Sequence, residues 1–269
     1  MLGAIIGDII GSVHEGAGTK TKNFPLYVPR SIFTDDTVLT VAVADWILTG
    51  KDLTDTLQTY YSSFPYRGYG GMFNEWASDK KRDPYNSYGN GSAMRVSPVG
   101  FAFESIDEVL LWAERSSIVT HNHPEGIRGA QATAAAIYYA RQDQDKDQIR
   151  RLLESQFRYN LGTTIDKIRP TYCFDGTCQG TVPQALIAFL ESTSYEDAIR
   201  NAISLGGDAD TLACITGGIA EAYYGGVPQD LAVKAKRLLD PKLIDVIHRF
   251  RERFGLASRN KTVFDESDL

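Results

Sequence analysis

The opening segment, MLGAIIGDIIGSVHEG, carries apolar side chains at the spacing of an α-helix. These are Ile5, Ile6, Ile9, Ile10 and Val13, and the pattern predicts a buried helix. A second stripe at four-residue intervals contains Gly3, Gly7 and Gly11. Each glycine costs a helix about 1 kcal/mol relative to alanine, so the stripe predicts that another backbone packs closely here. Glu15 follows this helix directly and is a candidate for a pocket.

Helical patterns continue along the chain with little interruption. We expect helices over 35–49, 54–64, 70–78, 106–116, 126–141, 146–157, 180–191, 195–205, 210–224, 229–239 and 241–254. Long runs of alternating apolar and polar residues are absent, and no repeated strand–helix pattern indicates a βαβ sheet. The sequence therefore predicts an all-α protein with one compact many-helix domain over 1–256 and a polar C-terminal tail over 257–269.

Two long polar segments interrupt the helices, at 79–92 and 159–179. Loops of this length inside a compact helical domain are usually functional or mobile. We therefore expect a functional role or mobility for both rather than a passive connection.

Composition narrows the class of protein. Of the 269 residues, 43% are hydrophobic and 23% charged, which is typical of a soluble globular protein. The net charge of −6 argues against a nucleic-acid-binding surface. A nucleotide ligand is still compatible with this charge, because a bound cation can supply positive charge locally.

The cysteines and the N-terminal segment bear on the compartment. Cys173, Cys178 and Cys214 are too few for a disulfide framework, and their odd number fits a reducing compartment. Zinc is not expected, because Cys173 and Cys178 have no second ligand pair nearby. The opening segment has no basic region and contains Asp8, unlike a signal peptide. No run approaches the ~20 apolar residues of a membrane span, so we expect a cytoplasmic protein without a membrane partner.

Two acidic clusters are the most informative chemical feature. FTDDTVLT (33–40) and GGDADTLA (206–213) each place carboxylates and a hydroxyl immediately before a long apolar helix. Their oxygen-bearing residues are Thr34, Asp35, Asp36, Asp208, Asp210 and Thr211. An all-oxygen ligand set of this kind suits Mg²⁺ or Mn²⁺.

Helix capping is the simpler explanation for either cluster alone. Thr34 is a good N-cap residue, and aspartates in a first turn interact favourably with the helix dipole. However, both following helices are apolar nearly all round, so their N-termini should lie in the interior or at a pocket floor. Several buried carboxylates repel one another unless they are protonated or neutralised. A pair of divalent cations would relieve that repulsion.

The segment 88–95, YGNGSAMR, has the character of an anion-binding loop. Its two glycines allow several N–H groups to face one way, although a simple tight turn explains the same residues. His121 and His123 could be metal ligands, but we expect His121 to hydrogen-bond a ligand or the loop backbone. The tyrosines near the loop could stack on a base, but most aromatic residues at helical spacing belong to the core; they are Tyr66, Tyr69, Tyr85 and Tyr88.

Five segments, taken in order, resemble the ADP-ribosylglycohydrolase family, which includes dinitrogenase reductase-activating glycohydrolases and ADP-ribosylarginine hydrolases. They are GAIIGDIIGSVHEG, FTDDTVLT, GNGSAMRVSPVG, THNHPEG and SLGGDADTLACITGGIAEAYYG, and they span nearly the whole chain. The resemblance implies an all-helical fold with a centre of two divalent cations, Mg²⁺ or Mn²⁺.

The resemblance also assigns roles to residues. The family's metal ligands match Thr34, Asp35, Asp36, Asp208, Asp210 and Thr211. The acidic residue that gates or contacts the site in some relatives matches Glu15, so Glu15, Asp35 and Asp36 are candidate catalytic groups. Contacts with ADP-ribose are implied for Gly89, Asn90, Gly91, Ser92 and His121. No departure is visible at the metal ligands.

The implied reaction is hydrolysis of the bond between C1″ of an ADP-ribosyl group and its attached group, which releases ADP-ribose. The substrate is an ADP-ribosylated protein or a small-molecule ADP-ribose conjugate, with the leaving group left open. A monomer is expected, because one helical domain with a polar surface has no obvious need of a partner.

Other functions fit the sequence less well. An all-α isoprenoid-type diphosphate enzyme typically carries DDxxD, whereas Leu39 stands four residues after Asp35. The DxD of glycosyltransferases belongs to an α/β scaffold, and a His-Asp phosphohydrolase needs a His-Asp dipeptide that the chain lacks. An ADP-ribose-binding regulatory protein on the same scaffold is the non-enzymatic alternative.

Overall fold

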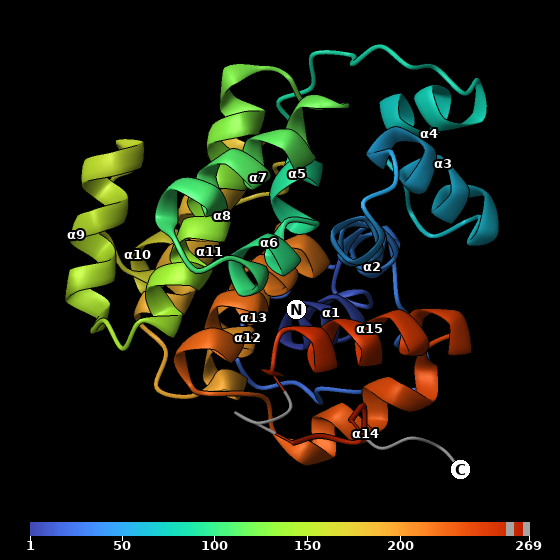
Figure 1. Cartoon of the computed structure of the whole chain (residues 1–269). Helices are drawn as coiled ribbons and strands as arrows, with labels where there is room; N and C mark the ends of the chain where they lie inside the picture. Colours follow the sequence, from blue (N-terminus) through green and yellow to red (C-terminus); the bar gives the residue numbers. More distant parts are fainter. Residues whose placement is uncertain (257–260, 266–269) are drawn as a thin grey trace.

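The computed structural model describes residues 1–256 and 261–265, and within these ranges it is built from helices without a sheet (Figure 1). The helices are α1 (Leu2–Gly11), α2 (Asp35–Thr49), α3 (Leu53–Ser63), α4 (Gly71–Ser78), α5 (Gly91–Met94), α6 (Ser97–Ala102), α7 (Ile106–Ile118), α8 (Pro124–Arg141), α9 (Lys146–Phe157), α10 (Ile165–Ile168), α11 (Cys178–Leu190), α12 (Tyr195–Ile203), α13 (Ala209–Tyr223), α14 (Gln229–Leu238) and α15 (Pro241–Arg253). The predicted all-α class is confirmed.

The glycine stripe of α1 packs directly against α13. A Cβ atom on Gly3 would lie 2.3 Å from the carbonyl oxygen of Gly217, and one on Gly7 would lie 2.1 Å from that of Ala213. At Gly11 the nearest atom would be the Cα of Asp210, at 2.5 Å. Only glycine permits this approach, so the predicted close packing is confirmed. The stripe therefore positions the N-terminus of α13 against the end of α1.

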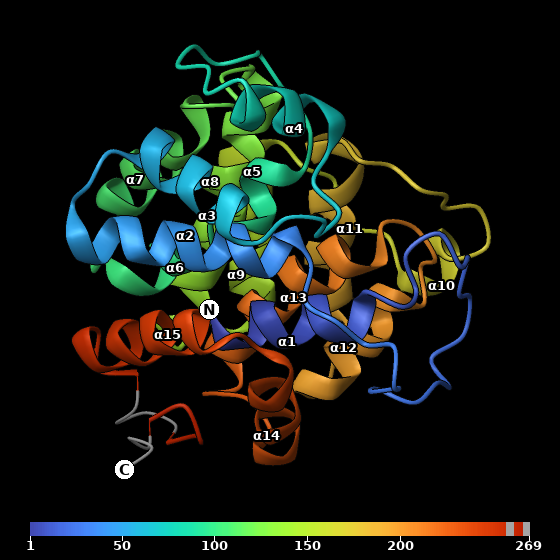
Figure 2. The same cartoon turned by 90° about the vertical axis from the view of Figure 1, so that its right-hand side faces the viewer.

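The central helices α1 and α13 are buried and apolar, and other helices cover them (Figures 1 and 2). On one side α2 lies between α1 and the pair α3 and α4, with α15 packed along it. On the other side α8 and α11 pack against α13, and α9 lies outside α8. Gly11 of α1 lies against Asp210 in the first turn of α13, and Asp8 of α1 accepts a hydrogen bond from Thr34 at the start of α2. The N-termini of α2 and α13 therefore both lie near the C-terminal end of α1.

The predicted helix ranges agree with the observed ones to within one or two residues at nearly every boundary. The pattern misses the short helices α5, α6 and α10. Helix α10 lies inside the segment predicted as a loop over 159–179, and α5 begins at the end of the loop over 79–92. Helices of four to six residues are too short to establish a periodic pattern.

The predicted tail falls only partly within the described residues. Positions 257–260 and 266–269 lie outside them. Phe264 is buried, and Asp265 accepts a 2.8 Å hydrogen bond from Nε of Arg251 in α15. The segment 261–265 therefore packs on the domain that the sequence delimits at residue 256, and that boundary stays a prediction.

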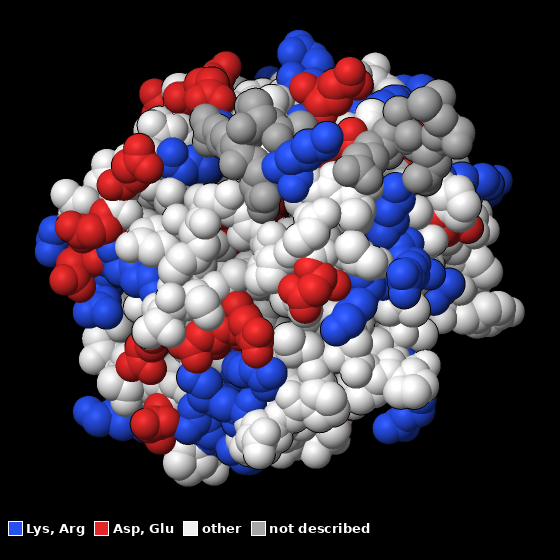
Figure 3. All heavy atoms as spheres, turned by 90° about the horizontal axis from the view of Figure 1, so that it is seen from below, with Lys and Arg blue, Asp and Glu red and all other residues white. Residues whose placement is uncertain are grey.

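Surface charges of both signs are mixed over the face that contains α14 and α15 (Figure 3). Groups of Lys and Arg lie beside groups of Asp and Glu on this face. Across the described residues, every helix is too short or too polar to span a membrane.

Candidate active site

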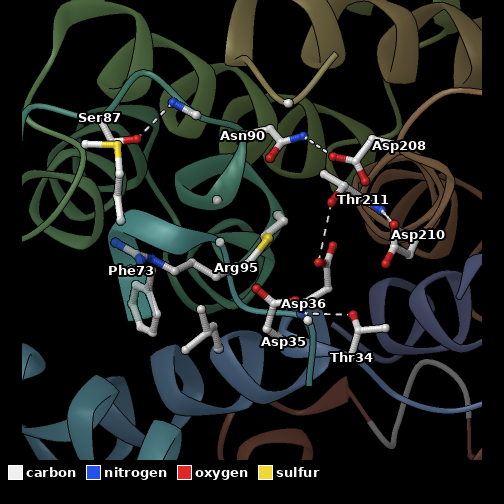
Figure 4. A pocket seen from close by; sticks show the side chains of 18 of the residues that line it. Thr34, Asp35, Asp36, Phe73, Ser87, Asn90, Arg95, Asp208, Asp210 and Thr211 are labelled. Carbon is white, nitrogen blue, oxygen red and sulfur yellow. Dashed lines mark hydrogen bonds between the residues drawn. The ribbon is translucent and has the colours of Figure 1, made fainter. Parts of the chain in front are cut away.

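One cavity of about 330 Å³ lies where the two acidic helix N-termini meet (Figure 4). Its walls come from the α1–α2 loop, the first turns of α2 and α13, the start of α4, the loop before α5, and the segment before α11. The expected site residues that line it are Glu15, Thr34, Asp35, Asp36, Gly89, Asn90, Gly91, His121, Asp208, Asp210 and Thr211. Segments far apart in sequence thus converge on a single site.

The first acidic cluster forms the N-terminus of α2. Thr34 is the N-cap, and its Oγ1 accepts a 3.2 Å hydrogen bond from the backbone N–H of Asp36. The N–H of Asp35 donates to the carbonyl of Arg67 at 2.8 Å. Capping therefore explains Thr34, but the Asp35 and Asp36 side chains point toward the cavity (Figure 4).

Asp8 holds this helix terminus in place from α1. Its fully buried carboxylate accepts hydrogen bonds from the backbone N–H groups of Thr34, at 3.0 Å, and Thr37, at 3.1 Å. It also accepts from the hydroxyl of Thr34 at 2.6 Å and from that of Thr37. Asp8 thus satisfies N–H groups that the first turn of α2 cannot pair internally. Sequence reasoning missed this role; the only signal was a lone carboxylate within a buried helix.

The second acidic cluster forms the N-terminus of α13, and here capping fails as an explanation. Asp208 occupies the N-cap position without a side-chain capping hydrogen bond. Its Oδ2 instead accepts a 2.7 Å hydrogen bond from Nδ2 of Asn90, which aims the carboxylate at the cavity (Figure 4). Asp210 Oδ1 accepts a 3.1 Å bond from the N–H of Thr211.

The two clusters touch across the cavity. The hydroxyl of Thr211 donates to Oδ2 of Asp36 at 3.4 Å, whereas Oδ1 of Asp36 is buried without a hydrogen-bond partner. Glu15 joins from the α1–α2 loop, and one carboxylate oxygen each from Glu15, Asp208 and Asp210 lie within 4.8 Å of one another. The acidic groups therefore form one contiguous site.

Burial and mutual repulsion raise the pKa of most of these carboxyl groups. Burial is the largest cause at Asp36, followed by the charges of Asp8, Asp35 and Asp208, and its pKa lies well above the usual value. The pKa of Asp35 and of Asp210 is also raised well above the usual value, again mainly by burial. Within the described residues, Lys and Arg form no ion pair with either cluster.

This environment fits a divalent cation. The donors are all oxygens, one buried carboxylate oxygen of Asp36 lacks any donor, and the carboxylates repel one another. Hard cations prefer such oxygen donors, and their charge removes the repulsion.

The glycine loop offers fewer free N–H groups than the sequence suggests. The N–H of Gly89 donates to Oγ of Ser87 at 3.0 Å, and that of Asn90 to the carbonyl of Gly176 at 2.8 Å. The N–H groups of Gly91 and Ser92 lack an acceptor among the described residues. An anion at this loop would therefore meet two free N–H groups at the start of α5.

Ser92 and His123 lie away from the cavity chemistry. Ser92 is fully buried, and its hydroxyl donates to the carbonyl of Gly126 at 2.8 Å, so only its backbone could reach a ligand. His123 caps α8, where its Nδ1 accepts from the N–H of Glu125 at 3.1 Å. His121, by contrast, is buried beside the glycine loop and lines the cavity.

Apolar residues form the wall that the acidic motifs did not indicate. Phe73 of α4 and Phe174 line the cavity, as do Tyr85 and Met72. Phe174 is 56% exposed at the mouth and belongs to the long loop over 159–179. Tyr85 is one of the tyrosines expected either to stack on a base or to pack in the core. Phe174 is a single aromatic residue in a loop and gives no periodic signal, so the sequence could not identify it. Both long loops nevertheless reach the site.

Comparisons with known proteins identify the family. The family model described as ADP-ribosylglycohydrolase matches residues 1–261. ADP-ribosylhydrolase ARH3 from Xenopus tropicalis is 27% identical, with 84% of this chain and 86% of that protein covered. The human ARH3 is 26% identical, with 84% of each chain covered.

A bacterial relative and a solved structure extend the comparison. ADP-ribosylarginine hydrolase Tri1 from Pseudomonas putida is 26% identical, with 87% of this chain and 72% of that protein covered. A solved chain titled "ADP-ribosylglycohydrolase-related protein complex" has the same fold, with a TM-score of 0.63 at 21% identity over 97% of this chain and 96% of that one. The chain therefore belongs to the ADP-ribosylglycohydrolase family of enzymes.

Proposed function

We propose that this enzyme hydrolyses the C1″ glycosidic bond of an ADP-ribosyl group carried by a protein side chain or a small molecule, and that it requires two divalent cations, Mg²⁺ or Mn²⁺. The observation that carries the proposal is the pair of buried acidic helix N-termini, from α2 and α13, that face one cavity without a neighbouring Lys or Arg ion pair among the described residues. The names of the relatives support the ADP-ribosyl substrate.

The cations would be held by the oxygen donors of the two clusters. Those donors come from Thr34, Asp35, Asp36, Asp208, Asp210 and Thr211. Bound there, divalent cations would neutralise the carboxylates and polarise oxygens of the ribose. The hydrogen bond from Asn90 fixes Asp208 before any ligand arrives, and Asp8 does the same for the terminus of α2.

A carboxylate of the chain would take the proton of the attacking water. Glu15, Asp35 and Asp36 are the candidates, and Glu15 is the one exposed to solvent. Partial burial of the carboxyl group and the charges of Asp208 and Asp8 raise the pKa of Glu15, which brings it closer to the value that suits a general base. The water oxygen bonds to C1″, the leaving group departs with the electron pair of the broken bond, and the proton passes on to it.

The apolar wall and the glycine loop would bind the rest of the substrate. Phe73 and Tyr85 could pack against the flat or apolar parts of an ADP-ribosyl group, and the N–H groups of Gly91 and Ser92 could donate to its diphosphate. Phe174 at the mouth is placed to contact the leaving group.

The proposal is tested by measuring release of free ADP-ribose from conjugates with different linkages. The panel holds arginine-linked, serine-linked and acylated ADP-ribose, each assayed with Mg²⁺, with Mn²⁺ and with EDTA. We expect release from one linkage with metal and none with EDTA. Tight binding of ADP-ribose without release from any conjugate would instead support a binding protein. Release that persists in EDTA would contradict the role of the cations.

A further inference from the structure

Arg95, at the C-terminal end of α5, is a buried cation that the proposed reaction does not use. Its side chain is fully buried beside the cavity, and Nη2 donates to the carbonyl of Ser116 and to Oγ1 of Thr120, both at 2.7 Å. Nε and Nη1 have no partner within the described residues. Burying a guanidinium with only part of its hydrogen bonds satisfied lowers the stability of the fold. We therefore expect a role for Arg95 at the adjoining cavity.

Thr120 links Arg95 to His121. Its Oγ1 lies 2.8 Å from Nδ1 of His121 as well as 2.7 Å from Nη2 of Arg95. A guanidinium can only donate hydrogen bonds, so Thr120 must accept from Arg95. Nδ1 of His121, at 2.8 Å, can accept the one proton of this hydroxyl, so that the proton is paired. The opposite arrangement, in which Oγ1 accepts from both Arg95 and an Nδ1–H, would leave the hydroxyl proton without a partner among the hydrogen bonds of Thr120.

The opposite edge of the imidazole faces the cavity. A Cβ on Gly91 would lie 3.1 Å from Nε2 of His121, and one on Gly89 would lie 3.6 Å from it, and both glycines line the cavity. The main chain of His121 is fixed from both sides, because its N–H donates to the carbonyl of Ser117 and its carbonyl accepts from the Ser117 hydroxyl. The ring therefore has a defined orientation.

We propose that Arg95 and Thr120 are positioning residues that hold neutral His121 as its Nε2–H tautomer, so that His121 donates a hydrogen bond to an acceptor oxygen of the ligand. Burial and the nearby Arg95 charge hold the pKa of His121 well below its usual value, which keeps the ring neutral. Without this relay, Nε2 could equally well be an acceptor. The ligand's identity as an ADP-ribosyl group rests on the proposed function, whereas the tautomer does not.

The tautomer can be read directly by ¹⁵N NMR of protein labelled at histidine. The chain has only four histidines, and the spectrum of His121→Gln identifies the signals of His121 by their loss. We expect a neutral ring with a protonated Nε2 and an unprotonated Nδ1 in the parent protein. A ring protonated at Nδ1, or an imidazolium at neutral pH, would overturn the inference whatever the variants do.

Two substitutions at Thr120 test the relay. Thr120→Ser keeps the hydroxyl and should keep the parent spectrum, whereas Thr120→Val removes it and should give a mixture of tautomers. An unchanged His121 spectrum in Thr120→Val would show that the relay does not set the tautomer. Dispersed spectra for both variants would show that they are folded.

Affinity for ADP-ribose, measured by calorimetry, gives the functional readout. We expect Thr120→Val to bind about tenfold more weakly, the loss of roughly one hydrogen bond, and Thr120→Ser to bind within about twofold of the parent. Equal affinity in both variants would contradict the donor role. If the parent shows the Nε2–H tautomer but does not bind ADP-ribose, the proposed function fails while the assigned tautomer stands.

Discussion

The molecule contains two buried clusters of charged groups, and they are built in opposite ways. At the active site, carboxylates from α2 and α13 face one another without a neighbouring Lys or Arg ion pair among the described residues. The second cluster surrounds Arg251, a buried residue of α15. Its Nε lies 2.8 Å from Oδ1 of Asp265, and its Nη1 lies 3.6 Å from Oε1 of Glu221. Glu221 also accepts from the N–H of Gly3 at 2.7 Å.

The pKa shifts express this difference. Burial raises the pKa of Asp265, but the Arg251 guanidinium and hydrogen bonds from Thr262 outweigh it and leave that pKa lowered. At Asp36 burial and like charges act in the same direction, and the pKa is raised. The Arg251 cluster is neutralised within the fold, whereas the active-site cluster needs protons or a bound cation.

Removing one active-site carboxylate should have the largest effect on activity. We expect Asp36→Ala and Asp210→Ala each to lower the rate of ADP-ribose release about a thousandfold, or about 4 kcal/mol, because each removes a proposed cation ligand. The metal-free variants should melt within a few degrees of the parent, since an unpaired buried carboxylate is lost together with its packing.

Asp107→Ala is the matched control for these variants. Asp107 also lies in the first turn of a helix, α7, but it is exposed and does not line the cavity. Its loss should leave activity unchanged. Equal activity in all three variants would mean that Asp36 and Asp210 only stabilise the N-termini of their helices and are not needed for the reaction.

Removing the cation of the Arg251 cluster should lower stability and leave activity unchanged, the opposite of the effect at the active site. Arg251→Met should destabilise the protein by about 3 kcal/mol, because Asp265 loses its buried cationic partner. Glu221 keeps its 2.6 Å ion pair with the N-terminal ammonium of Met1. Activity per folded molecule should be unchanged, since Arg251 lies outside the cavity. Chemical denaturation measures the free energy of unfolding, and the rate of ADP-ribose release divided by the amount of folded protein measures the activity. A large loss of activity at unchanged stability would show that the two clusters are not separate.

Asp8 sharpens the comparison, because it is a buried carboxylate satisfied by hydrogen bonds alone. Asp8→Asn should destabilise the protein by about 2 kcal/mol, since an amide cannot accept all four of these bonds. Cation affinity should also fall, because the terminus of α2 loses its anchor. If denaturation shows no loss of stability, Asp8 does not hold the helix terminus.

The smallest expected effect is the pH dependence of stability without metal. The raised pKa values of Asp35, Asp36 and Asp210 mean that the folded state binds more protons than the unfolded state above the usual value of 3.8. Metal-free stability should therefore fall as the pH rises from about 4 toward neutrality. Mg²⁺ at ten times its Kd should restore about 1.4 kcal/mol, or roughly 3 °C in Tm.

This restoration should be larger at pH 8 than at pH 5, where protons already occupy the carboxylates. Thermal melts with Mg²⁺ and with EDTA at the two pH values measure it. Equal Mg²⁺ shifts at both values would mean that the cation does not bind these groups.

The helical fold was predictable because long helices repeat apolar positions and end at recognisable residues. The range 35–49 matches α2, and the glycine stripe of α1 correctly indicated a close helix contact. Single-turn α5 and α10 were not predictable, since four residues cannot display a period. Local sequence determines the long helices, whereas tertiary packing determines the single-turn helices.

The site was predictable only in part, for a related reason. The clusters around Asp36 and Asp210 stand out as local motifs, and the structure places both at one cavity. The contacts of Asp8, Arg95 and Phe174 join segments distant in sequence, so no local pattern reveals them. Even within a motif, Ser92 turned away to the carbonyl of Gly126.

The central claim is that the active-site carboxylates bind divalent cations, and direct titration of metal-free protein with Mn²⁺ tests it most directly. Calorimetry combined with electron paramagnetic resonance counts the bound ions. We expect two Mn²⁺ ions per chain in the parent and in Asp107→Ala, and fewer, more weakly bound ions in Asp36→Ala and Asp210→Ala. No specific Mn²⁺ binding by the parent, or the same stoichiometry and affinity in all four proteins, would contradict it.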